Sequence, residues 1–174
     1  MTSFFSPDPL SMFRRVASIV SVSLLTAFLG ACTEQAAISS YFEESQSIAE
    51  RMVQTGTDFE AIMGAQDSPL AWSDETVQRL DAVRASMDSL HKEASNMSVP
   101  EAFVDVHPLL VQSLENMVQA IDIISGIAKD PSTASVRSAK DMTAKAQEGE
   151  RLANEYVTAL ERVLTEKYPE MIQG

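Results

Sequence analysis

The two histidines of the chain, His91 and His107, are the residues whose type and spacing could most directly support chemistry. An imidazole can bind a metal or haem iron, and it can exchange a proton near neutral pH. Both histidines lie eight residues from Val99, on opposite sides of it. A turn there would bring the two rings to a similar height on antiparallel helices. A haem, metal or small-ligand site near His91 and His107 is therefore one interpretation.

We expect both histidines to have structural roles, because the sequence lacks the other motifs that a reactive site needs. The Glu-x-x-His spacing of di-iron bundles does not occur. Neither a Gly-x-Ser-x-Gly motif nor a Gly-rich phosphate loop occurs, and one cysteine cannot form a Cys-x-x-Cys-His haem motif. We therefore predict no catalytic residues, no enzymatic activity, no bound metal and no cofactor.

Four amphipathic segments must position any site that this chain has. Their apolar residues recur in steps of three and four, which is typical of helices with one buried face. Helix-start patterns precede the segments at Ser40-Tyr-Phe-Glu43, at Ser73, at Ser98-Val-Pro-Glu101 and at Asp130-Pro131. The predicted helices are residues 40–63, 74–96, 99–129 and 131–168, followed by a tail at 169–174.

The third segment is the most apolar of the four, so we expect it to be the most buried. Pro108 lies inside it and should bend it or separate its first turn, because proline removes a backbone hydrogen bond. No alternating strand pattern or second domain is present. Short connections between four amphipathic helices predict an all-α fold, an up-down-up-down four-helix bundle at residues 40–168.

The chain is strongly acidic, with 25 Asp and Glu against 13 Lys and Arg and a formal net charge of −12. Recognition of nucleic acid begins with a basic patch, so we expect no nucleic-acid partner. The same charge opposes electrostatic adhesion to anionic lipids. A soluble, acidic bundle is the expected form of the helical region.

The N-terminal region has the three parts of a secretory signal. Arg14 and Arg15 precede an uncharged, mainly apolar run at residues 16–29, and small residues then lead to Cys32. This run is shorter than the ~20 apolar residues that a membrane-spanning helix needs. Residues 1–11 contain Asp8 and no basic residue, unlike the start of a signal, so we expect translation to begin at Met12.

Leu29-Gly30-Ala31-Cys32 resembles the lipobox of bacterial lipoproteins, and this resemblance covers only the first 32 residues. It implies that residues 1–31 are a signal peptide removed before Cys32. It also implies that the Cys32 sulfur carries a diacylglyceryl group, whose two chains hold a protein stably at a membrane. In an ordinary cleaved signal, Cys32 would instead be the one unpaired thiol of an exported protein.

The resemblance implies a location in the cell envelope. In a cell with two membranes, Thr33 in place of Asp after Cys32 is similar to the pattern of lipoproteins sent to the inner leaflet of the outer membrane. In a cell with one membrane, the protein would lie on the outer face of the cell membrane. We predict that residues 32–39 comprise the lipidated Cys32 and a short spacer at residues 33–39. The bundle that follows is expected to act as an interaction or accessory module for an envelope protein partner, with unknown contact residues.

Overall fold

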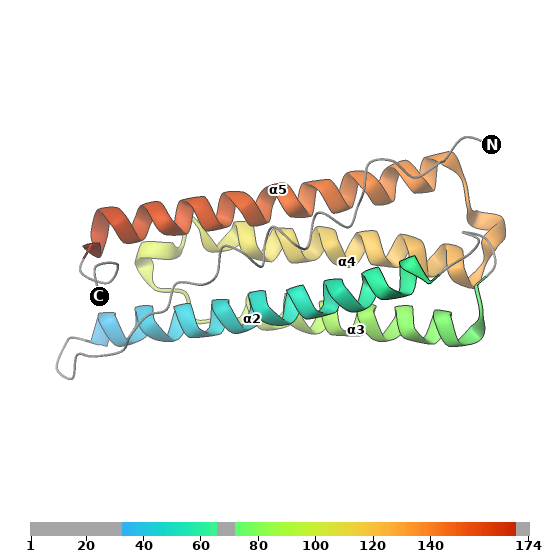
Figure 1. Cartoon of the computed structure of the whole chain (residues 1–174). Helices are drawn as coiled ribbons and strands as arrows, with labels where there is room; N and C mark the ends of the chain where they lie inside the picture. Colours follow the sequence, from blue (N-terminus) through green and yellow to red (C-terminus); the bar gives the residue numbers. More distant parts are fainter. Residues whose placement is uncertain (1–32, 66–71, 170–174) are drawn as a thin grey trace.

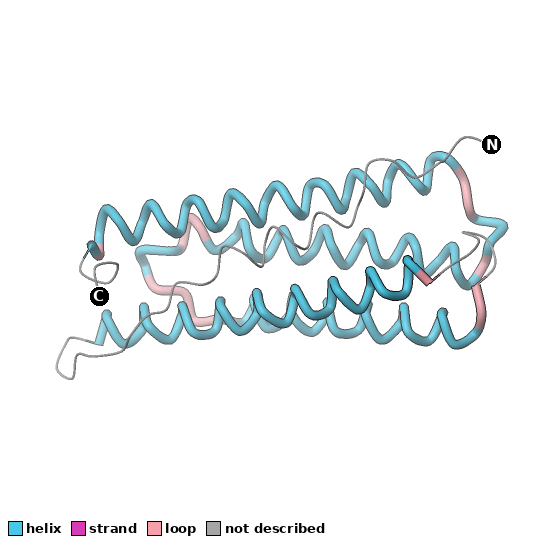
Figure 2. The backbone as a smooth tube through the Cα atoms, viewed as in Figure 1, coloured by secondary structure: helices cyan, strands magenta, loops and turns pink. Residues whose placement is uncertain are grey.

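The computed structural model describes residues 33–65 and 72–169, and no strand occurs within them. Four long helices run alternately up and down, which confirms the predicted all-α four-helix bundle (Figures 1 and 2). In order, the elements are α2 (Thr33–Gly64), α3 (Asp74–Asn96), the 3₁₀ turn η1 (Glu101–Phe103), α4 (His107–Lys129), the 3₁₀ turn η2 (Pro131–Thr133) and α5 (Val136–Lys167). The predicted signal peptide, the start at Met12 and the lipidation site Cys32 lie outside the described residues.

The predicted apolar faces form the core. On α2, the positions predicted in steps of three and four include Tyr41, Ser45, Ile48 and Met52, and all four are buried. Helix α4 has eleven buried residues against six on α3 and five on α5, so it is more enclosed than either neighbour, as its composition predicted. It packs between α3 and α5, while α2 packs on α3.

Helix α2 begins at Thr33 rather than Ser40, so the prediction of a spacer at residues 33–39 was wrong. The sequence Glu34-Gln-Ala-Ala37 consists of good helix formers. Ile38 lies three residues before Tyr41 on the same face, and only 1% of it is exposed. This burial extends the helix beyond the capping pattern at Ser40.

The third predicted helix is divided, and this division matches the expectation for Pro108. Residues 101–103 form η1, a turn follows, and α4 begins at His107 with Pro108 in its first turn. Proline is tolerated there because the first N–H groups of a helix have no partner within the helix. The prediction of one helix over 99–129 was therefore wrong at its start.

The fourth helix begins at Val136 and not at residue 131. Asp130 accepts a hydrogen bond from Ser132 N at 3.0 Å, so the Asp-Pro pattern caps only the short turn η2. Ser135 and Ser138 then form a capping box for α5. By contrast, α3 occupies its predicted range, and Ser73 caps it by accepting from Thr76 N.

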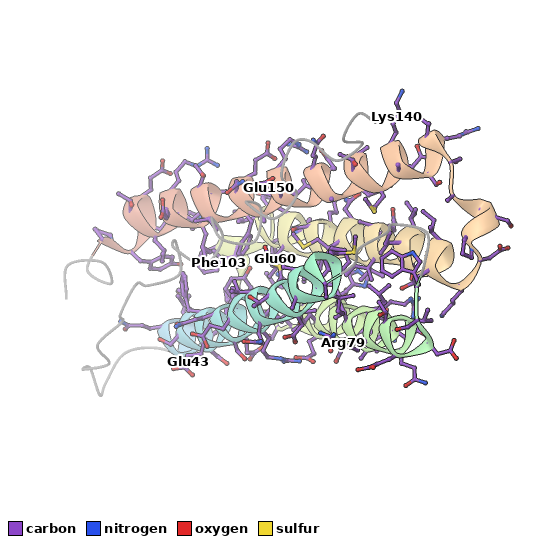
Figure 3. The ribbon with its side chains drawn as sticks, turned by 45° about the vertical axis from the view of Figure 1, so that its right-hand side comes forward. Glu43, Glu60, Arg79, Phe103, Lys140 and Glu150 are labelled. Carbon is purple, nitrogen blue, oxygen red and sulfur yellow. The ribbon has the colours of Figure 1, made fainter. Side chains whose placement is uncertain are left out.

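Within residues 33–65 and 72–169, no helix combines the length and apolar character needed to cross a membrane. The outer faces carry charged side chains such as Glu43 and Lys140, which point away from the bundle, whereas Phe103 lies inside it (Figure 3). This arrangement places the chemistry-bearing side chains in two settings, a buried polar cluster and a charged surface.

Candidate functional site

A buried polar cluster joins all four long helices near the start of α2. The Nδ1 atom of His107 on α4 lies 3.2 Å from the hydroxyl of Tyr41 on α2, and its Nε2 atom lies 3.0 Å from the carbonyl oxygen of Ala94 on α3. The Tyr41 hydroxyl also lies 3.2 Å from that of Tyr156 on α5. Tyr156 donates a hydrogen bond to Ser45 Oγ on α2 at 3.1 Å. We call these five residues the four-helix polar cluster.

The hydrogen bond to Ala94 determines the tautomer of His107. A carbonyl oxygen only accepts, so Nε2 must carry the proton and donate it. Burial lowers the pKa of His107 and favours the neutral ring, although the bond to Ala94 acts in the opposite direction. In this neutral ring Nδ1 is an acceptor, and the Tyr41 hydroxyl donates to it.

Burial also keeps both tyrosines protonated. It raises the pKa of Tyr156, and it raises the pKa of Tyr41 far above the ordinary value, with a further contribution from Tyr156. The residues of the cluster are therefore uncharged near neutral pH. Neutral groups avoid the large desolvation cost that a buried charge would carry.

Aromatic contacts hold the Tyr41 ring in place. It stacks on Phe103 of η1, with ring centroids 5.0 Å apart and planes 5° from parallel. Phe42 meets both rings edge-on, at 6.3 Å from Tyr41 and 5.6 Å from Phe103. Phe103 has no exposed surface and Tyr41 is only 1% exposed. The polar cluster is thus closed off from solvent on the side of η1.

This geometry suits structural specificity better than catalysis. A catalytic acid or base must reach a substrate, whereas Tyr41, Ser45, His107 and Tyr156 are all buried. Each polar atom of the cluster instead meets a partner from another helix. Such a cluster stabilises one alignment of the four helices, because a shifted register would leave buried polar groups unpaired.

The two sequence-predicted histidines are not brought into one metal site. Both nitrogens of His107 are used in hydrogen bonds, so its ring presents no free lone pair to a metal. His91 is half-buried on α3, where it interacts electrostatically with Asp88 of the same helix. Among residues 33–65 and 72–169, no group of three or more His, Cys, Asp or Glu side chains could hold a metal ion.

Sequence reasoning missed the partners of His107. Tyr41 and Ser45 lie on the predicted apolar face of α2. Two residues with hydroxyl groups, spaced four apart on such a face, indicate a buried polar contact. On the fourth predicted helix, the apolar residues in steps of three and four run through Ala153, Val157, Leu160 and Leu164 and leave out Tyr156. The structure buries Tyr156 and leaves Val157 half-buried.

The surface carries ion pairs between neighbouring helices. Arg51 on α2 donates to Glu93 on α3 through both terminal guanidinium nitrogens, and Arg84 on α3 pairs with Asp122 on α4. Lys129 on α4 lies 2.7 Å from Asp81 on α3. All of these side chains are about half exposed, so each pair contributes little to the stability of the fold and is weakened by salt.

No protein-family model matches this chain, and neither the search of curated proteins nor the search of solved structures found a match. The fold and the site themselves define the class. It is an all-α four-helix bundle with a neutral, buried polar cluster and a charged outer surface.

Proposed function

We propose that the protein is a lipid-anchored envelope protein whose helical bundle acts as an interaction or accessory module. The pattern from Arg14 to Cys32 is the observation that carries this proposal, because it combines a basic flank, a short apolar run and a lipobox-like ending. In a cell with two membranes, the diacylglyceryl group on Cys32 holds the protein in the inner leaflet of the outer membrane. In a cell with one membrane, it holds the protein on the outer face of the cell membrane.

The folded part supports this proposal in two ways. The helices that begin at Thr33 pack around a shared apolar core. The net charge of −12 is suited to a soluble domain and opposes nucleic-acid binding. We assign the bundle no enzymatic role, because the polar cluster lies out of reach of a substrate.

The anchor is tested by intact mass and membrane partitioning of the protein made in a bacterium. The wild type is compared with Cys32→Ala and with Ser40→Ala, a matched small change at an exposed position of α2. We expect a chain that starts at Cys32 and carries acyl mass in the wild type and in Ser40→Ala. Cys32→Ala should lack that mass and leave the membrane fraction. An unmodified, soluble wild-type chain would refute the anchor.

The interaction role is tested by crosslinking in intact cells followed by purification of the lipidated protein. We expect one envelope protein to be captured reproducibly by the wild type and captured less by Cys32→Ala, which is not held at the membrane. Equal capture by both forms would show that the partner does not depend on the anchor. Visible absorbance or stoichiometric metal in the purified protein would favour a ligand-binding bundle instead.

A further inference from the structure

Glu60 on α2 has a buried carboxylate oxygen that meets no partner. In the described part of the chain, two side-chain atoms are buried without a hydrogen bond, Glu60 Oε1 and Ser125 Oγ. Ser125 is a neutral core residue and only 4% exposed. Glu60 differs because it is acidic and only half-buried, so it can be reached from outside the bundle. An unpaired, desolvated carboxylate oxygen destabilises a fold, and its presence needs an explanation.

The side chain of Glu60 leaves α2 on the side turned away from α3. Arg51 marks the side toward α3, because it pairs with Glu93 there. Glu60 follows Arg51 by nine residues, which is about two and a half turns of an α-helix, so the two side chains point in opposite directions. Figure 3 shows Glu60 on the side of α2 turned toward α5 and away from Arg79 of α3.

Helices α2 and α5 are joined much less closely than the other neighbours in the bundle. Helix α2 packs on α3, and α4 packs on α3 and α5, whereas α2 and α5 have no packing of similar extent. The described hydrogen bonds between α2 and the C-terminal part of the chain come from Tyr156 and Tyr168 and reach no further along α2 than Ser45. Between described residues, no hydrogen bond or ion pair joins residues 46–64 to α5. The side around Glu60 is therefore the open part of the bundle.

Apolar side chains lie near the level of Glu60 on both helices. Glu60 follows Ser45 by fifteen residues, and α5 runs in the opposite direction, so Glu60 is level with a point about fifteen residues before Tyr156. Met142 lies at that level on α5, and Met63 lies one turn after Glu60 on α2. Both are half-buried and pack against the core. A partner at this level would meet apolar surface beside the carboxylate.

The basic residues of α5 at this level do not pair with Glu60. Arg137 is paired within α5. Lys145 donates a hydrogen bond to α4, and Lys140 points away from the bundle (Figure 3). The described part of the chain thus supplies no cation to the carboxylate of Glu60.

We propose that residues 53–63 of α2 and 139–146 of α5 form the docking surface of the interaction module, and that its partner is a helix that places an arginine or lysine against Glu60. This inference rests on the proposed interaction role. The partner's cation donates to Oε1 and balances the carboxylate charge. Apolar residues one turn away on the same partner helix pack on Met63 and Met142, as amphipathic helices do when they bind between two others.

The stability of the free protein gives the first test, because a group kept for binding lowers stability when its partner is absent. Glu60→Gln keeps the shape and removes the acid, so urea denaturation of the purified full chain should give a higher midpoint than the wild type. Glu50→Gln is the matched control, since Glu50 is an exposed acid on the same helix that already accepts from Gln46. Its midpoint should not move. An unchanged or lower midpoint in Glu60→Gln would overturn the proposal, because the carboxylate would then be solvated or paired within the chain.

Photo-crosslinking in intact cells gives the second test. A photoreactive amino acid replaces Thr57, an exposed residue one turn before Glu60, in the wild type, in Glu60→Gln and in Glu50→Gln. We expect one captured protein whose crosslinked peptide, sequenced by mass spectrometry, contains an arginine or lysine in an amphipathic pattern. Glu60→Gln should reduce this capture about tenfold, and Glu50→Gln should leave it unchanged.

The outcomes separate the docking surface from the interaction role. Equal capture by Glu60→Gln, or a crosslinked peptide without a basic residue, would overturn the docking proposal and leave the interaction role intact. Capture from photoreactive sites on other faces but not from position 57 would do the same. The absence of a captured protein from every site would refute the interaction role, and the docking surface with it.

Discussion

Removing the hydroxyl of Tyr41 should weaken the bundle strongly, although the change is only one oxygen atom. Tyr41→Phe keeps the ring that stacks on Phe103. It removes the group that lies 3.2 Å from both His107 Nδ1 and Tyr156 Oη. The substitution therefore separates the hydrogen-bonding role of the side chain from its packing role.

The expected loss follows from the contact with His107, to which the Tyr41 hydroxyl donates its proton. An acceptor left unpaired in the interior costs about 1–3 kcal/mol. Tyr156 can still donate to Ser45, whereas His107 Nδ1 loses its donor. We expect the free energy of unfolding to fall by about 1–3 kcal/mol, which is a substantial part of the 5–15 kcal/mol typical of a folded domain.

Urea denaturation followed by circular dichroism measures this loss as a shift of the midpoint at constant slope. Tyr168→Phe is the matched control, because it removes the same atom from an exposed hydrogen bond to Glu34. A surface change of this kind should alter stability by at most about 0.5 kcal/mol. Equal losses in the two variants would refute the reasoning that burial makes the Tyr41 hydroxyl important.

Two further predictions concern pH and helix packing. Burial lowers the pKa of His107 below its ordinary value of 6.5, so below that pH the unfolded state binds a proton that the folded state does not. This contribution to stability should be complete above about pH 6.5 and should be lost as the pH falls below that value. His107→Gln should flatten this slope in urea titrations at several pH values. A Cβ on Gly149 would lie 3.1 Å from Met117 Cγ and from the Ser113 carbonyl oxygen, so Gly149→Ala should lower the melting temperature, with a net loss of about 1–2 kcal/mol. Gly126→Ala is the control, because a Cβ there meets nothing within 4 Å. Its free energy of unfolding should rise by up to about 1 kcal/mol from helix propensity. If Gly149→Ala were stabilised in the same way, the packing argument would be wrong.

Local sequence patterns were enough to predict the class of fold. Steps of three and four placed Ile48, Met52, Leu80 and Leu114 on apolar faces, and all four are buried. A helix buries the same face along its whole length, so this periodicity survives whatever the helix packs against. The Ser73 cap and the position of Pro108 also acted as expected, because both effects depend on neighbouring residues only.

Tertiary contacts decided the helix starts and the site. Burial of Ile38 extends α2 seven residues beyond the predicted start, and no capping pattern reveals this. His107 could be chosen from the sequence as a residue of interest, but its neighbour Tyr41 is 66 residues away and Tyr156 is 115 residues from Tyr41. Contacts over such separations depend on how the helices rotate and align against one another. The sequence by itself therefore determined that the chain forms amphipathic helices, and its membrane address stays a prediction. Only the packing of four helices placed Tyr41, His107 and Tyr156 in one buried cluster.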